Sequence, residues 1–220
     1  MYRLVTFWHS TIGKKVVMAV TGIIGIGFVI GHIVGNLLVF RGPDAINSYS
    51  HFLHGPAGEL LWVVRIVLLT SVILHVTAAY QLTQRSHAAR PRDYAKREPQ
   101  VSTYASRLMR WGGVLLLVFI IFHILHLTTG TISPVPFVAG DVYANVTGGF
   151  RIWWVALFYI VAMMFLGLHV YHGGWSSMRT IGATSRSPNP LHRRAAAAIA
   201  VFVWLGFTVV PLAIWTGVIR

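Results

Sequence analysis

The sequence predicts an all-α integral membrane protein, a bundle of five transmembrane helices. Of the 220 residues, 55% are hydrophobic and only 10% are charged, and the mean hydropathy is +0.67. This composition excludes an ordinary soluble domain. Five continuously apolar runs approach the roughly 20 residues that cross a hydrocarbon core about 30 Å thick. Because the runs show no alternation, helices are favoured over barrel strands.

The five predicted helices cover about 16–40, 60–82, 107–129, 152–175 and 194–218, and together form a single transmembrane domain over 1–220. The first run is too long for the apolar region of a signal peptide, and no cleavage pattern of small residues follows it. We therefore expect it to remain as a membrane helix. The polar segments 91–99 and 185–190 are predicted to be short connectors. Five spans place the two termini on opposite faces of the membrane.

The distribution of charge predicts the orientation. The chain has 18 Lys and Arg against 5 Asp and Glu, for a net charge of +13. The amino-terminal segment and the second and fourth loops hold most of the cations: Arg3, Lys14, Lys15, Arg85, Arg90, Arg92, Lys96, Arg97, Arg107, Arg110, Arg179, Arg186, Arg193 and Arg194. The other face keeps Arg41, Arg65, Arg151 and Arg220. Lys and Arg concentrate in cytoplasmic loops, so the amino terminus is predicted to be cytoplasmic and the carboxyl terminus outside. Nucleic-acid binding is disfavoured, since the cations flank membrane spans and form no binding motif.

Histidine is the residue type that points to chemistry. Cysteine is absent, which excludes disulfides, thiol catalysis and iron–sulfur clusters bound by this chain. Ionisable residues are rare inside membrane helices, yet four of the five predicted spans carry histidine, namely His32, His75, His123 with His126, and His169 with His172. Hydrogen bonding between packed helices is the alternative explanation, and it fits one or two residues better than a pattern of one per helix.

The depth of these histidines predicts two pairs. His32, His75, His123 and His169 each lie nine or ten residues before the polar residue that ends their span, about 14 Å from the boundary at 1.5 Å per residue. Successive helices alternate in direction, so His32 shares an outer level with His123, and His75 shares an inner level with His169, on the order of 15 Å away. Two facing neutral imidazoles suit a six-coordinate haem iron, whereas zinc would need three or four ligands. The i, i+3 spacing leaves His126 and His172 as alternatives within their helices.

Other intramembrane residues fit the same picture. Gly27, Gly31 and Gly35 repeat every four residues beside His32, which would admit a neighbouring helix or a porphyrin ring. Ordinary packing of small residues explains these glycines equally well. Arg65 lies inside the second span, about 15 Å outward of His75. It is a candidate partner for a haem propionate, with extension of its side chain to the outer headgroups as the alternative.

Taken in order, these residues resemble the five-helix, two-haem cytochrome b membrane anchor of succinate:menaquinone oxidoreductases, which belong to complex II together with similar fumarate reductases. The resemblance extends over almost the whole chain. Each piece is short, and the ordered set carries the likeness: His9-Ser10, Gly31-His32 with Asn36, Phe40 to Ser48, His51-Phe52, His75, Arg110, His123, His169 with Gly173, and Trp175-Ser176.

The resemblance implies four axial ligands, with His32 and His123 on a distal haem b and His75 and His169 on a proximal one. It implies menaquinone as the electron acceptor. A flavoprotein subunit with FAD and an iron–sulfur subunit would dock on the cytoplasmic face, so this chain would not itself oxidise succinate. The expected location is the plasma membrane of a prokaryote, as a multi-pass protein in contact with lipid, and a higher oligomer of complexes is left open.

The sequence says less about the direction of the reaction, succinate oxidation or fumarate reduction, and about the class of membrane protein. Some fumarate reductase anchors carry a glutamate two residues before the fourth-helix ligand, where it is tied to proton movement, and this chain has Gly167 there. The difference favours succinate oxidation. The alternatives are a fumarate reductase anchor, a quinone-reactive cytochrome b of another respiratory dehydrogenase, a haem-free anchor and a histidine-based membrane transporter. A transporter relay would be expected to contain Asp or Glu within the spans, and these spans contain none.

Quinone reduction consumes protons and needs titratable groups near the quinone oxygens. We therefore predict an outer quinone site in the loop that carries His51, His54, Pro56 and Glu59. Each could instead be a solvated loop residue, and an inner site near the iron–sulfur partner stays open. The basic segment from Arg85 to Arg110 is expected to meet the partner subunits and anionic lipid, although topology alone accounts for most of its cations.

Overall fold

The computed structural model is all-α and describes residues 2–89, 104–183 and 190–219. It contains five helical segments that are long and apolar enough to cross a membrane: Thr11–Arg41, Gly58–Ala88, Tyr104–Thr128, Trp153–Thr180 and Leu191–Trp215. This confirms the predicted fold class. Six of the cations used in the topology argument lie outside the described residues, namely Arg90, Arg92, Lys96, Arg97, Arg186 and Arg220.

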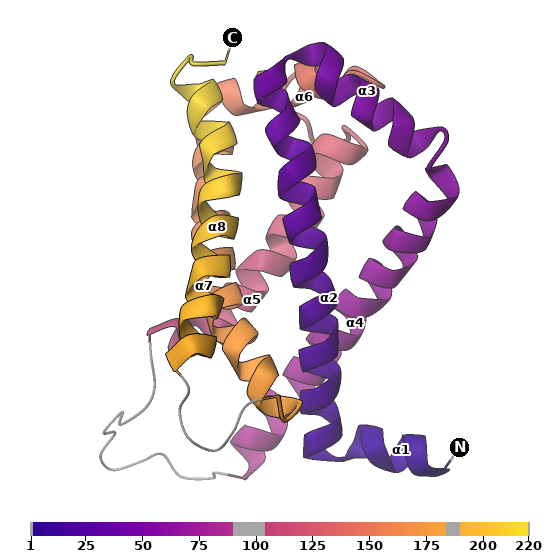
Figure 1. Cartoon of the computed structure of the whole chain (residues 1–220), viewed down its shortest axis with the longest axis vertical. Coiled ribbons are helices and arrows are strands. Elements are labelled where there is room, and N and C mark those ends of the chain that lie inside the picture. The colour runs from indigo at the N-terminus through magenta and orange to yellow at the C-terminus, as the bar shows by residue number, and fades with distance from the viewer. Residues whose placement is uncertain (1, 90–103, 184–189, 220) are drawn as a thin grey trace.

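The spans alternate in direction along the bundle (Figure 1). Helices α2 (Thr11–Leu37), α5 (Tyr104–His123) and α8 (Pro190–Trp215) run one way, and α4 (Gly58–Ala88) and α7 (Trp153–Thr180) run the other. The amino and carboxyl termini therefore lie at opposite ends. We call these the N-terminal end, where α4 and α7 end and α5 and α8 begin, and the C-terminal end. The cations predicted to be cytoplasmic fall at the N-terminal end wherever the structure describes them.

Two spans end in a change of helical form. A 3-10 turn, η1 (Leu38–Arg41), continues α2, and a π-helical segment, η2 (Ile124–Thr128), continues α5. π-Helical turns are rare and are frequent at functional sites. The π segment begins directly after His123 and contains His126.

Three short helices lie outside the spans. Helix α1 (Tyr2–His9) crosses the N-terminal end, and α3 (Pro43–His54) and α6 (Val142–Arg151) cross the C-terminal end (Figure 1). The segment that we predicted to be a loop carrying His51 and His54 is thus part of α3, and only a short turn separates it from α4. Gly42, at φ 91°, makes the bend that allows Pro43 to begin α3.

A polar clip formed by Asn47, Asp141, Tyr143 and Ala144 joins α3 to the start of α6. The side chain of Asn47 on α3 donates a hydrogen bond to Asp141 (2.9 Å) and accepts one from the backbone N–H of Tyr143 (3.0 Å). Asp141 also caps α6 by accepting from the N–H of Ala144 (2.9 Å). The clip fixes α3 against α6 over the C-terminal end, where the main apolar cluster also lies.

Helix α7 is the central element of the bundle. It packs along α8, α5 and α2, while α4 packs along α2. Within the described part of the chain, α2 makes no extended backbone contact with α5, nor does α4 with α7 or with α5. The pairs α2 with α5 and α4 with α7 are therefore not in close backbone contact, and in each pair histidine side chains make contact between the two helices.

Candidate functional site

The first histidine pair joins α2 and α5. The ring centroids of His32 and His123 lie 5.8 Å apart, and the ring planes meet at 81°. Phe28, one turn before His32 on α2, stacks on the His32 ring at 5.3 Å, and Phe207 of α8 lies 5.7 Å from it. Phe119 stacks on the His123 ring at 5.7 Å. The structure brings together the two residues that sequence depth had paired.

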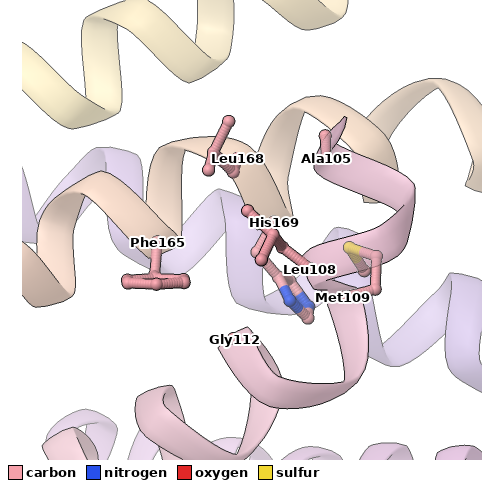
Figure 2. A pocket seen from close by; sticks show the side chains of 7 residues that line it. All are labelled: Ala105, Leu108, Met109, Gly112, Phe165, Leu168 and His169. Carbon is pink, nitrogen blue, oxygen red and sulfur yellow. The ribbon is translucent and has the colours of Figure 1, made fainter. Parts of the chain in front are cut away.

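The second pair joins α4 and α7. The centroids of His75 and His169 lie 6.1 Å apart, with the planes at 50°. Figure 2 shows His169 projecting from α7 toward the turn of α5 at Gly112, in a small pocket lined by Ala105, Leu108, Met109, Gly112, Phe165, Leu168 and His169. The Nδ1 atom of His169 is buried and has no hydrogen-bond partner among the described residues. An unpartnered buried nitrogen is costly.

The two pairs lie at different depths. Thr21 of α2 contacts His75 through its hydroxyl, with 3.0 Å between Oγ1 and Nδ1. His32 of the same helix contacts His123. Thr21 and His32 are eleven residues apart, which corresponds to about 16 Å along the helix at 1.5 Å per residue. This agrees with the separation expected from the sequence.

Both pairs fit a metal held between two imidazoles. Imidazole nitrogens bind metals at about 2.0 Å, so the centroids of two rings on opposite sides of one metal lie roughly 6 Å apart, close to both observed separations. The described residues contain no group of three or more His, Cys, Asp or Glu side chains that could surround an ion. A chain that offers two ligands per site suits a macrocycle that supplies the remaining four. The donor sets are therefore compatible with haem.

The three glycines of α2 do not share one role. A Cβ added at Gly27 or Gly31 would meet nothing within 4 Å, whereas at Gly35 it would lie 2.7 Å from Cε1 of Tyr49. Gly35 thus admits the ring of Tyr49 from α3, which is ordinary close packing. The face at Gly27 and Gly31, five residues and one residue before His32, remains open.

His126 and His172 are placed differently from the paired histidines. His126 is fully buried, and its Nε2 faces Gly149 of α6, where an added Cβ would lie 2.7 Å away. That nitrogen has no hydrogen-bond partner within the described ranges. His172 lies edge-on to Trp175 at 6.0 Å, toward the N-terminal end from His169. In each helix the structure thus distinguishes the two histidines that spacing alone could not.

Two hydroxyl groups were missed by the sequence analysis. Tyr159 of α7 places its hydroxyl 3.3 Å from Nδ1 of His123 and 3.0 Å from Nδ1 of His126, and Thr21 contacts His75 as described above. Both side chains are buried. A polar group inside a membrane span needs a partner, so each was a candidate for contact with a histidine. The rotational position that decides the contact is not encoded in spacing.

The predicted quinone residues lie at the C-terminal end. His54 donates from Nδ1 to the carbonyl of Ser50 (2.9 Å), and its Nε2 accepts from the guanidinium of Arg65 (3.3 Å). Arg65 also lies over the ring of Trp62, 5.0 Å from the centroid. The observed partners of Arg65 are thus a histidine and a tryptophan. His51, His54 and Glu59 are exposed around the turn between α3 and α4, and their role in quinone binding stays a prediction.

The N-terminal end is basic over its described residues. Among its cations, Lys14 is buried at 1% exposure and donates from Nζ to the carbonyl of Trp8, with its ammonium over the Trp8 ring. Trp175 lies between two guanidinium groups, those of Arg179 at 5.3 Å and Arg193 at 4.8 Å. Lys14 is therefore buried within the fold, while Arg179 and Arg193 are exposed.

Comparisons with models of protein families, with curated proteins and with solved structures found no match. The fold and the site therefore rest on this chain's own residues: a multi-pass helical membrane protein whose spans bring four histidines together as two facing pairs.

Proposed function

We propose that the chain is the di-haem b membrane anchor of a succinate dehydrogenase, which passes electrons from an iron–sulfur subunit to menaquinone. The observation that carries the proposal is the pair of facing histidines at each of two depths. His32 and His123 would hold one haem, and His75 and His169 the other. The ordered resemblance to complex II anchors supports the same assignment.

Haem, when bound, would supply one-electron transfer within the membrane. The chain's residues hold the two sites about 16 Å apart along α2, within a hydrocarbon core of about 30 Å. Apolar and aromatic side chains such as Phe28, Phe119 and Phe207 surround the outer pair and exclude water from it. Such a shell is one of the ways in which a protein sets the reduction potential of a metal site.

Menaquinone would be reduced at the C-terminal end, where His51, His54 and Glu59 are exposed and able to exchange protons. Substitutions His51→Ala and Glu59→Gln are expected to lower quinone reductase turnover and to weaken inhibition by a menaquinone analogue. Unchanged values for both would exclude this site and leave the quinone at the other end. The flavoprotein and iron–sulfur subunits would dock at the basic N-terminal end.

Gly167 supports succinate oxidation over the fumarate reductase alternative. A Cβ added there would lie 3.2 Å from Cβ of Trp204 and 3.6 Å from the carbonyl oxygen of Ala200 on α8. A side chain at this position would thus require Trp204 to shift, since α7 and α8 pack closely along their length. The chain lacks the carboxylate, and α8 packs closely where its side chain would begin.

Haem quantification tests the proposal. A dithionite-reduced minus oxidised spectrum, with pyridine haemochrome analysis of the purified complex, should give two b haems per chain. His32→Ala and His75→Ala should each abolish a different haem. A complex without haem would contradict the proposal, and loss of the same haem from both variants would contradict the pairing.

A further inference from the structure

A hydroxyl group contacts one histidine of each pair. Thr21 Oγ1 lies 3.0 Å from Nδ1 of His75, and the Tyr159 hydroxyl lies 3.3 Å from Nδ1 of His123. Each hydroxyl comes from a helix other than the one that carries its histidine, α2 for Thr21 and α7 for Tyr159. Thr21 is 8% exposed and Tyr159 is 6% exposed, so water does not compete for either contact.

The hydrogen bonds of Thr21 fix the tautomer of His75. A threonine hydroxyl has one proton, and that of Thr21 is donated to the carbonyl of Val17, one turn earlier on α2, at 2.7 Å. The oxygen is then left as an acceptor toward His75. Nδ1 of His75 must therefore carry the proton, which leaves the lone pair of Nε2 free to bind a metal.

The role of Tyr159 toward His123 depends on which of two histidines takes its proton. Its hydroxyl lies between two histidine nitrogens, Nδ1 of His123 at 3.3 Å and Nδ1 of His126 at 3.0 Å. We assign the single proton to the shorter contact, so that Tyr159 donates to His126 and accepts from His123. Nε2 of His123 is then free to bind a metal, while His126 carries its proton on Nε2, against Gly149.

We propose that Thr21 and Tyr159 are positioning residues, one for each haem of the proposed di-haem anchor, and this inference rests on that proposed function. Each accepts a hydrogen bond from Nδ1–H of one axial histidine, which fixes the tautomer and orientation of the ring and increases the basicity of the ligating nitrogen. A more strongly donating imidazole stabilises the ferric state, so each hydroxyl lowers the reduction potential of its own haem.

The test uses Thr21→Val and Tyr159→Phe in the complete complex. Both changes remove a hydroxyl and keep a similar shape, so the packing of Tyr159 against Phe119 and Phe150 is retained. Each variant should hold two haems per chain. In a redox titration followed at the b-haem absorption, Thr21→Val should raise only the midpoint potential that belongs to the His75 haem. Tyr159→Phe should raise only that of the His123 haem.

The two variants serve as reciprocal controls. Thr21→Ser restores the hydroxyl and should return the potential toward that of the unaltered chain. Tyr80→Phe removes a hydroxyl from an exposed position on α4 (63%) and should shift neither haem. Selective loss of the matching haem, in place of a shift, also supports the inference because the shape of the side chain is conserved.

Other results would overturn it. Two bound haems with unchanged potentials in both variants would contradict the inference and leave the proposed function standing. A shift of the same haem by both variants, or the loss of both haems from either one, would contradict the assignment of one hydroxyl per haem. An unaltered complex without haem would contradict the inference and the proposed function together.

Discussion

The imidazole rings of His32 and His123 lie 5.8 Å apart with their planes at 81°, whereas those of His75 and His169 lie 6.1 Å apart at 50°. The two pairs therefore have similar separations and different orientations. The first pair bridges α2 and α5, and the second bridges α4 and α7, neither of which is an extended contact in the described structure. Side chains make the contact within each pair of helices, while α7 packs along both α2 and α5 and α4 packs along α2.

The difference in ring orientation predicts two distinct haem signals. The angle between axial imidazole planes governs the anisotropy of a low-spin ferric haem, and near-perpendicular rings give the more anisotropic signal. Electron paramagnetic resonance of the oxidised complex should thus resolve two low-spin species, with the larger maximum g value from the haem at His32 and His123. Substitution His123→Ala should remove that signal and keep the other. A single signal accounting for two haems would contradict the difference in orientation.

His126 is predicted to be dispensable for haem binding. It is fully buried, contacts Tyr159 and faces Gly149, away from the pairing of His123 with His32. Substitution His126→Ala should keep two haems per chain and lower thermal stability, by roughly 2 kcal/mol as expected for a buried side chain of this size. The same substitution at His123, three residues earlier, should lose one haem. If His126→Ala lost the haem and His123→Ala kept it, the ligand assignment would be reversed.

The sequence predicted the five spans because length and continuous hydropathy are sufficient for a membrane helix. The histidine pairing followed from the alternating direction of successive membrane spans. The short helices α1, α3 and α6 were missed, since amphipathic segments of 8 to 12 residues resemble polar loops in an average of hydropathy. The orientation relative to the cytoplasm stays a prediction, because the structure contains no membrane.

The directions in which the site's side chains point could not be predicted from the sequence. His126 stands three residues after His123, and an ordinary α-helix would place both on one face. Both rings do contact the hydroxyl of Tyr159, and what distinguishes them is a second neighbour, His32 for His123 and Gly149 for His126. The π-helical segment that contains His126 was not predicted. The contact between Thr21 and His75 depends on the rotation of α2 relative to α4. Helix spacing gives the depth of a residue along its axis, and packing gives the direction in which it points.

The contact between Gly149 and His126 predicts a sensitive glycine. A Cβ at position 149 would lie 2.7 Å from Nε2 of His126 and 2.8 Å from Cε1. Gly149→Ala should therefore force the buried imidazole to move, at a cost of about 1 to 3 kcal/mol for overpacking, measured as reduced thermal stability in detergent. Gly113→Ala on α5 is the matched control, since an added Cβ there meets nothing within 4 Å and alanine favours helix. Equal stability of the two variants would contradict the packing around His126.

The clip at the C-terminal end predicts a dependence of stability on pH. The N–H of Ala144 and the side chain of Asn47 donate to the Asp141 carboxylate, and these hydrogen bonds hold the pKa of Asp141 below its usual value of about 3.9. Because the folded-state pKa is lowered, this contribution is complete above the unfolded-state pKa and is lost as the pH falls through the folded-state value. Thermal denaturation of the detergent-purified protein should thus show a loss of stability at acidic pH that is reduced in Asp141→Asn, which can cap α6 without titrating.

Removal of the cap separates this effect from general acid sensitivity. Asp141→Ala should lower stability near neutral pH by about 1 kcal/mol, the usual contribution of a helix N-cap, and Asn47→Ala should lower it through the same contacts with Asp141 and Tyr143. The double variant should then lose less than the sum of the two single losses, because the residues share a hydrogen bond. Asp44→Asn, on α3 outside the clip, is the control and should keep the acid response of the unaltered chain. Additive losses, or an acid response identical in Asp141→Asn and the unaltered chain, would show that Asn47 and Asp141 do not act as one unit holding α3 against α6.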